Sequence, residues 1–241
     1  MSTTPVLELD GVTAGYGRTT VLRDVSFAVA PGSVVAVLGP NGAGKTTTLR
    51  LVAGLIAPTS GAGRVKGDDV SKLRANRRAK RGVCLIPEGR GIFRSLTVAD
   101  NLRLQTPKRH EAQAVEKAVA AFPILGDRLT QVAGSMSGGQ QQMLALARAY
   151  LAEPDVVALD EVSMGLAPKI VDEIFESLRT LAAAGTALVL VEQYVHQALE
   201  MADTVVLLDR GTTSYVGPAS AIDQQELLRS YLGTHEPSLG A

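Results

Sequence analysis

The sequence predicts an α/β fold in which a mostly parallel sheet is flanked by helices. Short apolar runs of the kind that strands buried on both faces require occupy residues 33–38, 82–87, 156–161 and 186–192. Longer stretches with helical spacing separate these runs. Strands that alternate with helices are typical of a parallel sheet, so we expect one α/β core.

The two ends of the chain predict antiparallel strands instead. Residues 6–16 and 21–30 alternate between apolar and polar positions and are separated by a Gly-Arg pair, which predicts an antiparallel opening. The stretch VVLLDRGTTSYVG predicts a hairpin that turns at Arg210 and Gly211. A helix is expected after it, over residues 219–232.

The middle of the chain lacks strand patterns. Between Pro87 and Ala152 the sequence instead shows amphipathic helical spacing over 99–104, 111–122 and 140–151. We therefore expect a single domain over residues 1–241, with a core of about 1–87 and 153–241 and a helical subdomain of about 88–152.

Composition argues against several functional classes. The 241 residues include 24 Lys plus Arg and 24 Asp plus Glu, so nucleic acid is not expected as a partner. The N-terminus has no signal-peptide pattern, and no window approaches the ~20 apolar residues that span a bilayer, so we expect a cytoplasmic chain. The one cysteine, Cys84, lies in an apolar run and is expected to fill core volume.

Residues 39–46 read GPNGAGKT and match the phosphate-binding loop G-x-x-x-x-G-K-[ST]. The loop lies between a predicted buried strand and a predicted helix, which places it at a helix N-terminus. Its glycines let the backbone bend closely enough for N–H groups to surround phosphate oxygens. Lys45 is expected to reach the β- and γ-phosphates, Thr46 to ligate Mg²⁺ and Thr47 to bond a more internal phosphate. The nucleotide-binding residues predicted here are Gly39, Pro40, Asn41, Gly42, Ala43, Gly44, Lys45, Thr46 and Thr47.

Another buried run ends in two adjacent carboxylates, Asp160 and Glu161. A strand would deliver them to the carboxyl edge of the sheet, where ligands bind in open α/β folds. Their side chains point differently because successive strand residues face opposite ways. We expect Asp160 to ligate Mg²⁺ and Glu161 to act as the general base for the attacking water, so the chain is predicted to be an ATPase.

A third motif carries a family resemblance. Ser137, Gly138, Gly139 and Gln140 resemble the LSGGQ signature of ATP-binding cassette (ABC) ATPases, with Met in place of the usual Leu. A Ser and two glycines that open a helix form a second anion site. The resemblance spans residues 6–233 and implies that two cassettes pack head to tail, each signature closing over the γ-phosphate held by the other phosphate loop.

The resemblance also implies roles for residues outside these motifs. Tyr16 matches the aromatic residue on which adenine stacks. Glu88 stands where the family normally has a Gln that touches Mg²⁺. Ser163 begins the D-loop, whose usual Asp is Ala167 in this chain.

Two polar residues compete for the family's switch position, which is usually a His after the last core strand. Counting back from Ala202 and Asp203, which match an AD pair in the family, places the switch at Gln193. His196 follows on an expected helix. A Gln amide can donate to phosphate, although it does not titrate near neutrality. We expect Gln193 to act in hydrolysis and His196 to be silent.

Within the family, the stretch PEGRGIFRSLTV and the terminal YLG resemble the smaller ATPase subunit of branched-chain amino acid importers. This implies ATP hydrolysis coupled to uptake at the inner face of the cell membrane. The implied partners are a second cassette, identical or different, two membrane permease subunits and, indirectly, a periplasmic or extracellular binding protein. Importers of urea, amides or aromatic acids, and soluble ABC ATPases outside transport, are the alternatives.

Two surface features have two interpretations each. Phe93 either anchors a permease helix in a groove formed in part by residues 89–96 or packs in the core. A basic cluster either contacts anionic lipid headgroups or forms a solvated helix face, and the second interpretation is favoured. The cluster consists of Lys72, Arg74, Arg77, Arg78, Lys80 and Arg81.

Overall fold

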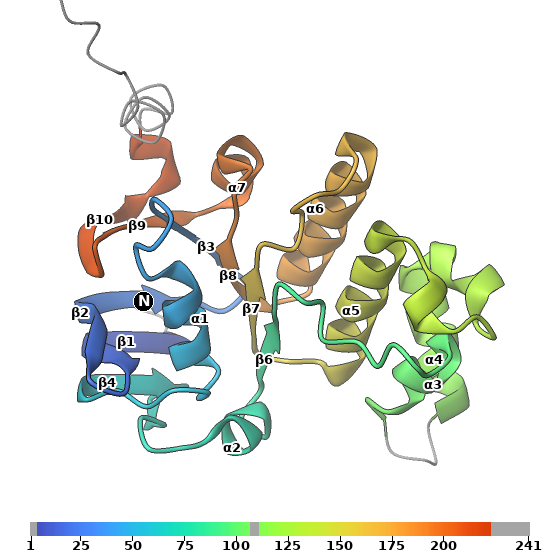
Figure 1. Ribbon diagram of the computed structural model, residues 1–241, viewed down its shortest axis with the longest axis horizontal. Helices are drawn as coiled ribbons and strands as arrows, with labels where there is room; N and C mark the ends of the chain where they lie inside the picture. Colours follow the sequence, from blue (N-terminus) through green and yellow to red (C-terminus); the bar gives the residue numbers. More distant parts are fainter. Residues whose placement is uncertain (1–3, 107–110, 223–241) are drawn as a thin grey trace, which may run out of the picture.

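The computed structural model of the chain describes residues 4–106 and 111–222 (Figure 1). Its first layer is a four-stranded antiparallel sheet with the order β2-β1-β4-β5. The alternating sequence at the N-terminus forms β1 and β2, so the antiparallel opening is confirmed. The strands are β1 (Leu7–Tyr16), β2 (Thr19–Val29), β4 (Ser60–Val65) and β5 (Asp68–Asp69).

The second layer is a six-stranded sheet with the order β10-β9-β3-β8-β7-β6. All neighbouring pairs are parallel except β10 and β9, the predicted hairpin, whose turn at Arg210 and Gly211 has positive φ at both residues. The mostly parallel core sheet is therefore confirmed. Its strands are β3 (Val34–Leu38), β6 (Val83–Ile86), β7 (Val156–Asp160), β8 (Ala187–Val191), β9 (Thr204–Asp209) and β10 (Thr212–Pro218).

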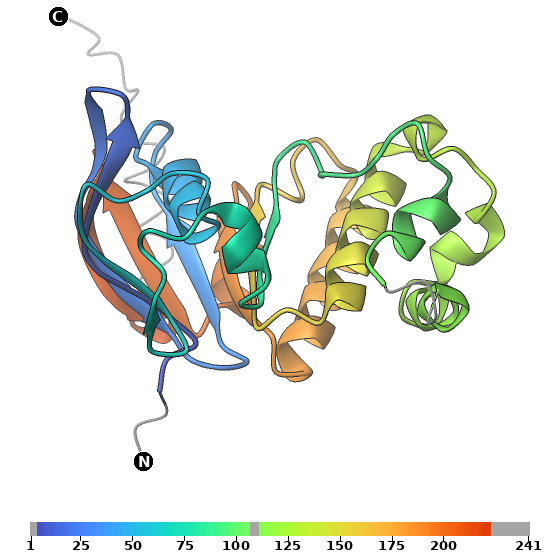
Figure 2. The same ribbon diagram turned by 90° about the horizontal axis from the view of Figure 1, so that it is seen from below.

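The core sheet is buried on both faces, as its continuous apolar runs require. Along β3, Val34, Ala36 and Leu38 belong to one hydrophobic cluster, whereas Val35 and Val37 belong to another. The first cluster joins the sheet to α5, α6 and α7, and the second joins it to α1 and the antiparallel sheet. Figures 1 and 2 show α1 and the antiparallel sheet on one side of β6 and β7, and α5 and α6 on the other.

The helices are α1 (Lys45–Val52), α2 (Ala75–Ala79), α3 (Val98–Arg103), α4 (Glu111–Ala121), α5 (Gly138–Ala152), α6 (Pro168–Ala183) and α7 (Val195–Met201), with 3-10 turns at Pro123–Arg128, Ala133–Ser135 and Ala219–Ala221. In Figure 2, α3 and α4 lie at the far end of the molecule from the antiparallel sheet. The helix expected over 219–232 lies mostly outside the described residues. No helix of the described chain is long and apolar enough to cross a membrane.

One member of the basic cluster contradicts the solvated-face prediction. Arg78 is 1% exposed, and its Nη1 donates to the carbonyls of Leu51 at 2.6 Å and Val52 at 3.1 Å. These carbonyls end α1, where four C=O groups lack partners within the helix and cations are favoured. Burial lowers the pKa of Arg78. The sequence could not distinguish this helix-capping arginine from its exposed neighbours Arg77 and Arg81.

Candidate functional site

Four loops meet at the carboxyl edge of the core sheet. Strands β3, β8, β7 and β6 are neighbours and run parallel, so the residues that follow them lie along one edge. The phosphate loop at 39–44 follows β3, the carboxylates Asp160 and Glu161 lie at the end of β7, Gln193 follows β8 and Glu88 follows β6. Sheet order thus gathers motifs that are far apart in sequence.

The geometry of the phosphate loop requires two of its glycines. A Cβ at Gly39 would lie only 2.3 Å from the carbonyl oxygen of Leu208. Gly44, the N-cap of α1, has a φ of 108°, which side chains rarely adopt, and it provides no side-chain cap. The N–H groups of the first turn of α1 are therefore available to an anion.

Lys45 lies inside the phosphate loop. Its Nζ donates to the carbonyl of Gly39 at 2.7 Å and to that of Pro40 at 3.2 Å. Burial lowers the pKa of Lys45, and the nearby charges of Glu161 and Asp160 oppose that shift. The ammonium group is thus held where the loop would surround phosphate, and its contact with nucleotide stays a prediction.

The predicted magnesium ligands supply hard oxygen donors. The hydroxyl of Thr46 donates to Oδ1 of Asp160 at 3.1 Å, which joins the phosphate loop to β7. Asp160 is 5% exposed, and burial raises its pKa, aided by the charges of Glu161 and Glu88 and opposed by the Thr46 bond. A divalent cation would neutralise this buried carboxylate, so these residues fit Mg²⁺.

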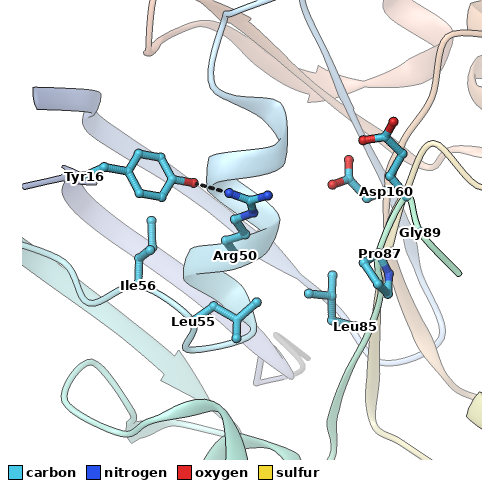
Figure 3. A pocket seen from close by; sticks show the side chains of 9 residues that line it. Tyr16, Arg50, Leu55, Ile56, Leu85, Pro87, Gly89 and Asp160 are labelled. Carbon is cyan, nitrogen blue, oxygen red and sulfur yellow. Dashed lines mark hydrogen bonds between the residues drawn. The ribbon is translucent and has the colours of Figure 1, made fainter. Parts of the chain in front are cut away.

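Glu88 and Asp160 both line an open pocket beside this pair, and Figure 3 shows Asp160 at its edge. Pro87 and Asp160 border it on one side, and Tyr16 and Arg50 on the other. In the described part of the chain, no three His, Cys, Asp or Glu side chains cluster to hold a metal by themselves. Mg²⁺ held by Thr46, Asp160 and Glu88 would therefore need additional oxygen ligands, such as nucleotide phosphates and water.

Tyr16 lies at the end of β1 with 41% of its surface exposed. Its hydroxyl accepts a hydrogen bond from Nη1 of Arg50 at 3.2 Å and lies 3.5 Å from the hydroxyl of Thr47 (Figure 3). The guanidinium carbon of Arg50 is 5.9 Å from the ring centroid. The ring thus lies beside the phosphate loop at a position suited to stacking on adenine, although this role stays a prediction.

The predicted base and switch residue contact each other. Nε2 of Gln193 donates to Oε2 of Glu161 at 3.2 Å. Glu161 has a φ of 49°, a conformation uncommon for a residue with a side chain, and its N–H donates to the carbonyl of Val191 at 2.9 Å. His196 lies on α7 and pairs instead with Glu200 at 3.5 Å. The structure therefore places Gln193, rather than His196, beside Glu161.

Sequence reasoning missed Glu192. This residue is 3% exposed, and Ser163 donates to it through both its N–H and its hydroxyl. Burial raises the pKa of Glu192 to about 7, with a smaller contribution from the charge of Glu161, while the bonds from Ser163 and from the N–H of Gln193 oppose the shift. The sequence signal that could have identified Glu192 is an acidic residue directly after the wholly apolar strand β8.

The signature residues begin α5 as predicted. Ser137 is the N-cap and forms a capping box with Gln140: the hydroxyl of Ser137 accepts from the N–H of Gln140 at 3.4 Å, and Oε1 of Gln140 accepts from the N–H of Ser137 at 3.1 Å. A Cβ at Gly139 would lie 2.4 Å from the side chain of Ile170. Gly138 lies beside Arg90: a Cβ at Gly138 would lie 2.9 Å from Nη2 of Arg90.

Arg90 and Gln141, which sequence reasoning also missed, connect the loop after β6 to α5. Nη1 of Arg90 donates to Oε1 of Gln141 at 2.5 Å. Nε2 of Gln141 donates in turn to the carbonyls of Ala133 and Met136, both at 3.1 Å. This buried amide holds the segment that leads into the signature. The pair is 51 positions apart, and nothing in the sequence points to it.

Phe93 is 49% exposed, so the interpretation as a core residue is wrong. The guanidinium of Arg148 lies 5.0 Å from its ring centroid, and Arg148 also donates to the carbonyl of Gly91. The loop after β6 is thus attached to α5 by this arginine as well, with an aromatic face left at the surface.

Comparison with known proteins decides the family. The ABC transporter family profile matches residues 22–164, more than half of the chain. The chain belongs to the ABC transporter family. This ABC ATPase is 38% identical over 232 residues to the high-affinity branched-chain amino acid transport ATP-binding protein BraG of Pseudomonas aeruginosa, covering 95% of this chain and 100% of BraG.

Other similar proteins lead to the same family. The ABC ATPase is 33% identical to the lipopolysaccharide export system ATP-binding protein LptB of Acidithiobacillus ferridurans, covering 95% of this chain and 97% of LptB. A solved structure described as an ATP-binding subunit of an ABC transporter superposes with a TM-score of 0.78 at 28% identity, covering 97% of this chain and 96% of that one. The chain is therefore an ATP-binding ATPase with the fold of ABC cassettes.

Proposed function

We propose that this ABC ATPase energises an importer of branched-chain amino acids, working at the inner face of the cell membrane with two separate permease subunits. A periplasmic or extracellular binding protein would deliver the solute. The supporting observation is the likeness to BraG, which extends over nearly the whole of both chains. The sequence PEGRGIFRSLTV, which covers the loop after β6 and the first residue of α3, favours the same branch of the family.

The geometry supports a division of labour in hydrolysis. The phosphate loop and Lys45 would bind the phosphates of ATP, and Tyr16 would stack on adenine. Mg²⁺, held by Thr46, Asp160 and Glu88, would offset phosphate charge. Glu161 would orient and deprotonate the attacking water, and Gln193, whose amide bonds Glu161 at 3.2 Å, would donate to the γ-phosphate.

A second cassette would complete each nucleotide site. The phosphate loop begins α1, which packs on one face of the core sheet, and the signature begins α5, which packs on the other. Ser137, Gly138, Gly139 and Gln140 of one cassette would therefore contact the ATP bound by the other. In the purified chain the second cassette is another copy, whereas in the transporter it is either a copy or a different subunit.

Phe93 would contact a cytoplasmic helix of the permease. Its exposed ring lies in the loop that also carries Glu88, so one short segment would contact both the permease and the nucleotide site. Because Arg148 fixes this loop on α5, movement at the permease would reach the signature helix.

Solute uptake in a strain that lacks this protein tests the proposal. We expect loss of leucine, isoleucine and valine uptake, restored by the wild-type gene and not by a Glu161→Gln variant. Unchanged branched-chain uptake with loss of urea, amide or aromatic-acid uptake would assign another importer. A defect in lipopolysaccharide export instead would follow the likeness to LptB.

A further inference from the structure

Glu192 is a buried carboxyl group that has no role in the reaction proposed above. Oε1 accepts a hydrogen bond from the N–H of Ser163 at 3.1 Å, and Oε2 bonds the hydroxyl of the same residue. Burial of a carboxyl group costs free energy unless the group is hydrogen-bonded. Each oxygen of Glu192 thus accepts a hydrogen bond from Ser163, a residue in another loop.

This link joins the two loops that carry the residues proposed to act in hydrolysis. Ser163 lies two positions after Glu161, and Glu192 immediately precedes Gln193. Beside it, the N–H of Glu161 bonds the carbonyl of Val191 at 2.9 Å, and Gln193 bonds the carboxylate of Glu161 at 3.2 Å. Glu161 is therefore hydrogen-bonded to the end of β8 through its backbone N–H and to the residue two positions further on through its carboxylate.

We propose that Glu192 is a positioning residue for ATP hydrolysis, which holds the loop after Glu161 in register with the turn that carries Gln193. The inference rests on the roles proposed for Glu161 and Gln193. Glu161 has an uncommon backbone conformation, with φ at 49°, and such a conformation persists only when its surroundings impose it. The two hydrogen bonds that Ser163 donates to Glu192 supply part of that constraint.

The link does not require a charge. As a carboxylate, Glu192 accepts from both the N–H and the hydroxyl of Ser163. As a neutral acid, it still accepts from the N–H and can donate its own proton to the hydroxyl oxygen. A Gln side chain at this position offers the same acceptor and a donor, whereas Ala offers neither.

Steady-state hydrolysis by the purified chain tests the inference with Glu192→Ala and Glu192→Gln. We expect Glu192→Ala to lower kcat at least ~10-fold, because displacing a catalytic group by about 1 Å can cost ~100-fold. The KM for ATP should change less than ~2-fold, because Glu192 bonds Ser163 rather than the phosphate loop. Glu192→Gln should recover most of the lost kcat.

A control at the other end of β8 separates positioning from general stability. Thr186 immediately precedes the first residue of β8. It is 9% exposed, and its hydroxyl donates to the carbonyl of Pro154 at 3.2 Å. Thr186→Val removes that buried bond and should lower Tm while kcat stays at the wild-type value. Wild-type kcat in Glu192→Ala, or a fall of kcat in Thr186→Val that matches Glu192→Ala, would overturn the inference.

Two further variants keep the test decisive. If Glu192→Ala does not fold, Ser163→Ala deletes one of the two bonds; a lower kcat at unchanged KM supports the link, and wild-type kcat overturns it. Glu161→Gln serves as the reference for loss of the base. Full hydrolysis by Glu161→Gln would contradict the role of base proposed for Glu161, whereas full hydrolysis by Glu192→Ala alone would contradict only this inference.

Discussion

The two helix ends that can bind anions differ in how their N–H groups are satisfied. At α1 the N-cap is Gly44, which has no side chain to cap the helix. At α5 the N-cap Ser137 and Gln140 bond each other's backbone. The first end is open to a ligand, whereas the second already satisfies part of its polar groups within the chain. A phosphate that binds at α5 must therefore replace or add to bonds that the chain already makes.

The charges near the N-termini of α1 and α5 also differ. Two carboxylates lie near the start of α1: Asp160 accepts a hydrogen bond from Thr46, and the charge of Glu161 acts on Lys45. At the start of α5, the guanidinium of Arg90 lies beside Gly138. The first end thus suits phosphate together with a cation, and the second suits the bare negative charge of a terminal phosphate.

Lys45→Ala should have the largest effect, because it removes the charge that the phosphate loop holds at its centre. We expect at least ~100-fold weaker ATP binding and no measurable hydrolysis. Fluorescence titration with a labelled ATP analogue measures the Kd. Lys169→Ala, which removes an exposed lysine from the first turn of α6, is the matched control and should bind normally.

Ser137→Ala should separate the second helix end from the first. We expect the Kd for ATP of the single chain to be unchanged and kcat to fall by ~100-fold, the usual cost of losing one donor to developing charge. Loss of the cap should lower the free energy of unfolding by about 1 kcal/mol. Binding weakened as strongly as in Lys45→Ala would show that α5 contributes to the same chain's site.

Gln193→Ala should lower kcat by ~10-fold with a smaller change in Kd, because its amide contacts Glu161 rather than the phosphate loop. His196→Ala is the matched control, since this exposed side chain pairs with Glu200 on the same helix. We expect its kcat to equal that of the wild type. The reverse pattern would move the switch role to His196.

Glu192→Gln should change how stability depends on pH. Burial in the folded chain raises the pKa of Glu192 from 4.5 to about 7. Between pH 4.5 and about 7, folding is therefore coupled to the uptake of a proton by Glu192. The stabilising contribution is full below pH 4.5 and is lost as pH rises through about 7, at about 1 kcal/mol per pH unit. Urea unfolding at pH 5.5, 6.5 and 7.5 should show this fall in the wild type and a shallower one in the variant.

Much of the site could be predicted because each motif is local. The phosphate loop, the acids after β7 and the helix start at Ser137 are each defined by neighbouring residues, and the alternation of strands and helices predicts the sheet that gathers them. The switch position was assigned from the spacing to Asp203, and the structure places Gln193 against Glu161.

The missed features depend on which distant segments pack together. The bond from Ser163 to Glu192 joins residues 29 positions apart, and it exists because β7 and β8 are neighbours. Arg78 is buried because α2 lies against the end of α1. Charge patterning describes a sequence neighbourhood, so it cannot tell a buried arginine or acid from an exposed one.

Mixing two inactive variants tests the central claim most directly, namely that one nucleotide site uses α1 of one chain and α5 of another. A mixed dimer of Lys45→Ala and Ser137→Ala has one site with an intact phosphate loop and an intact signature. We predict that equal amounts of the two variants hydrolyse ATP well above the sum of their separate rates, up to roughly a quarter of the wild-type rate, because half of the dimers are mixed and one of their two sites is complete. A rate equal to the sum would contradict the account.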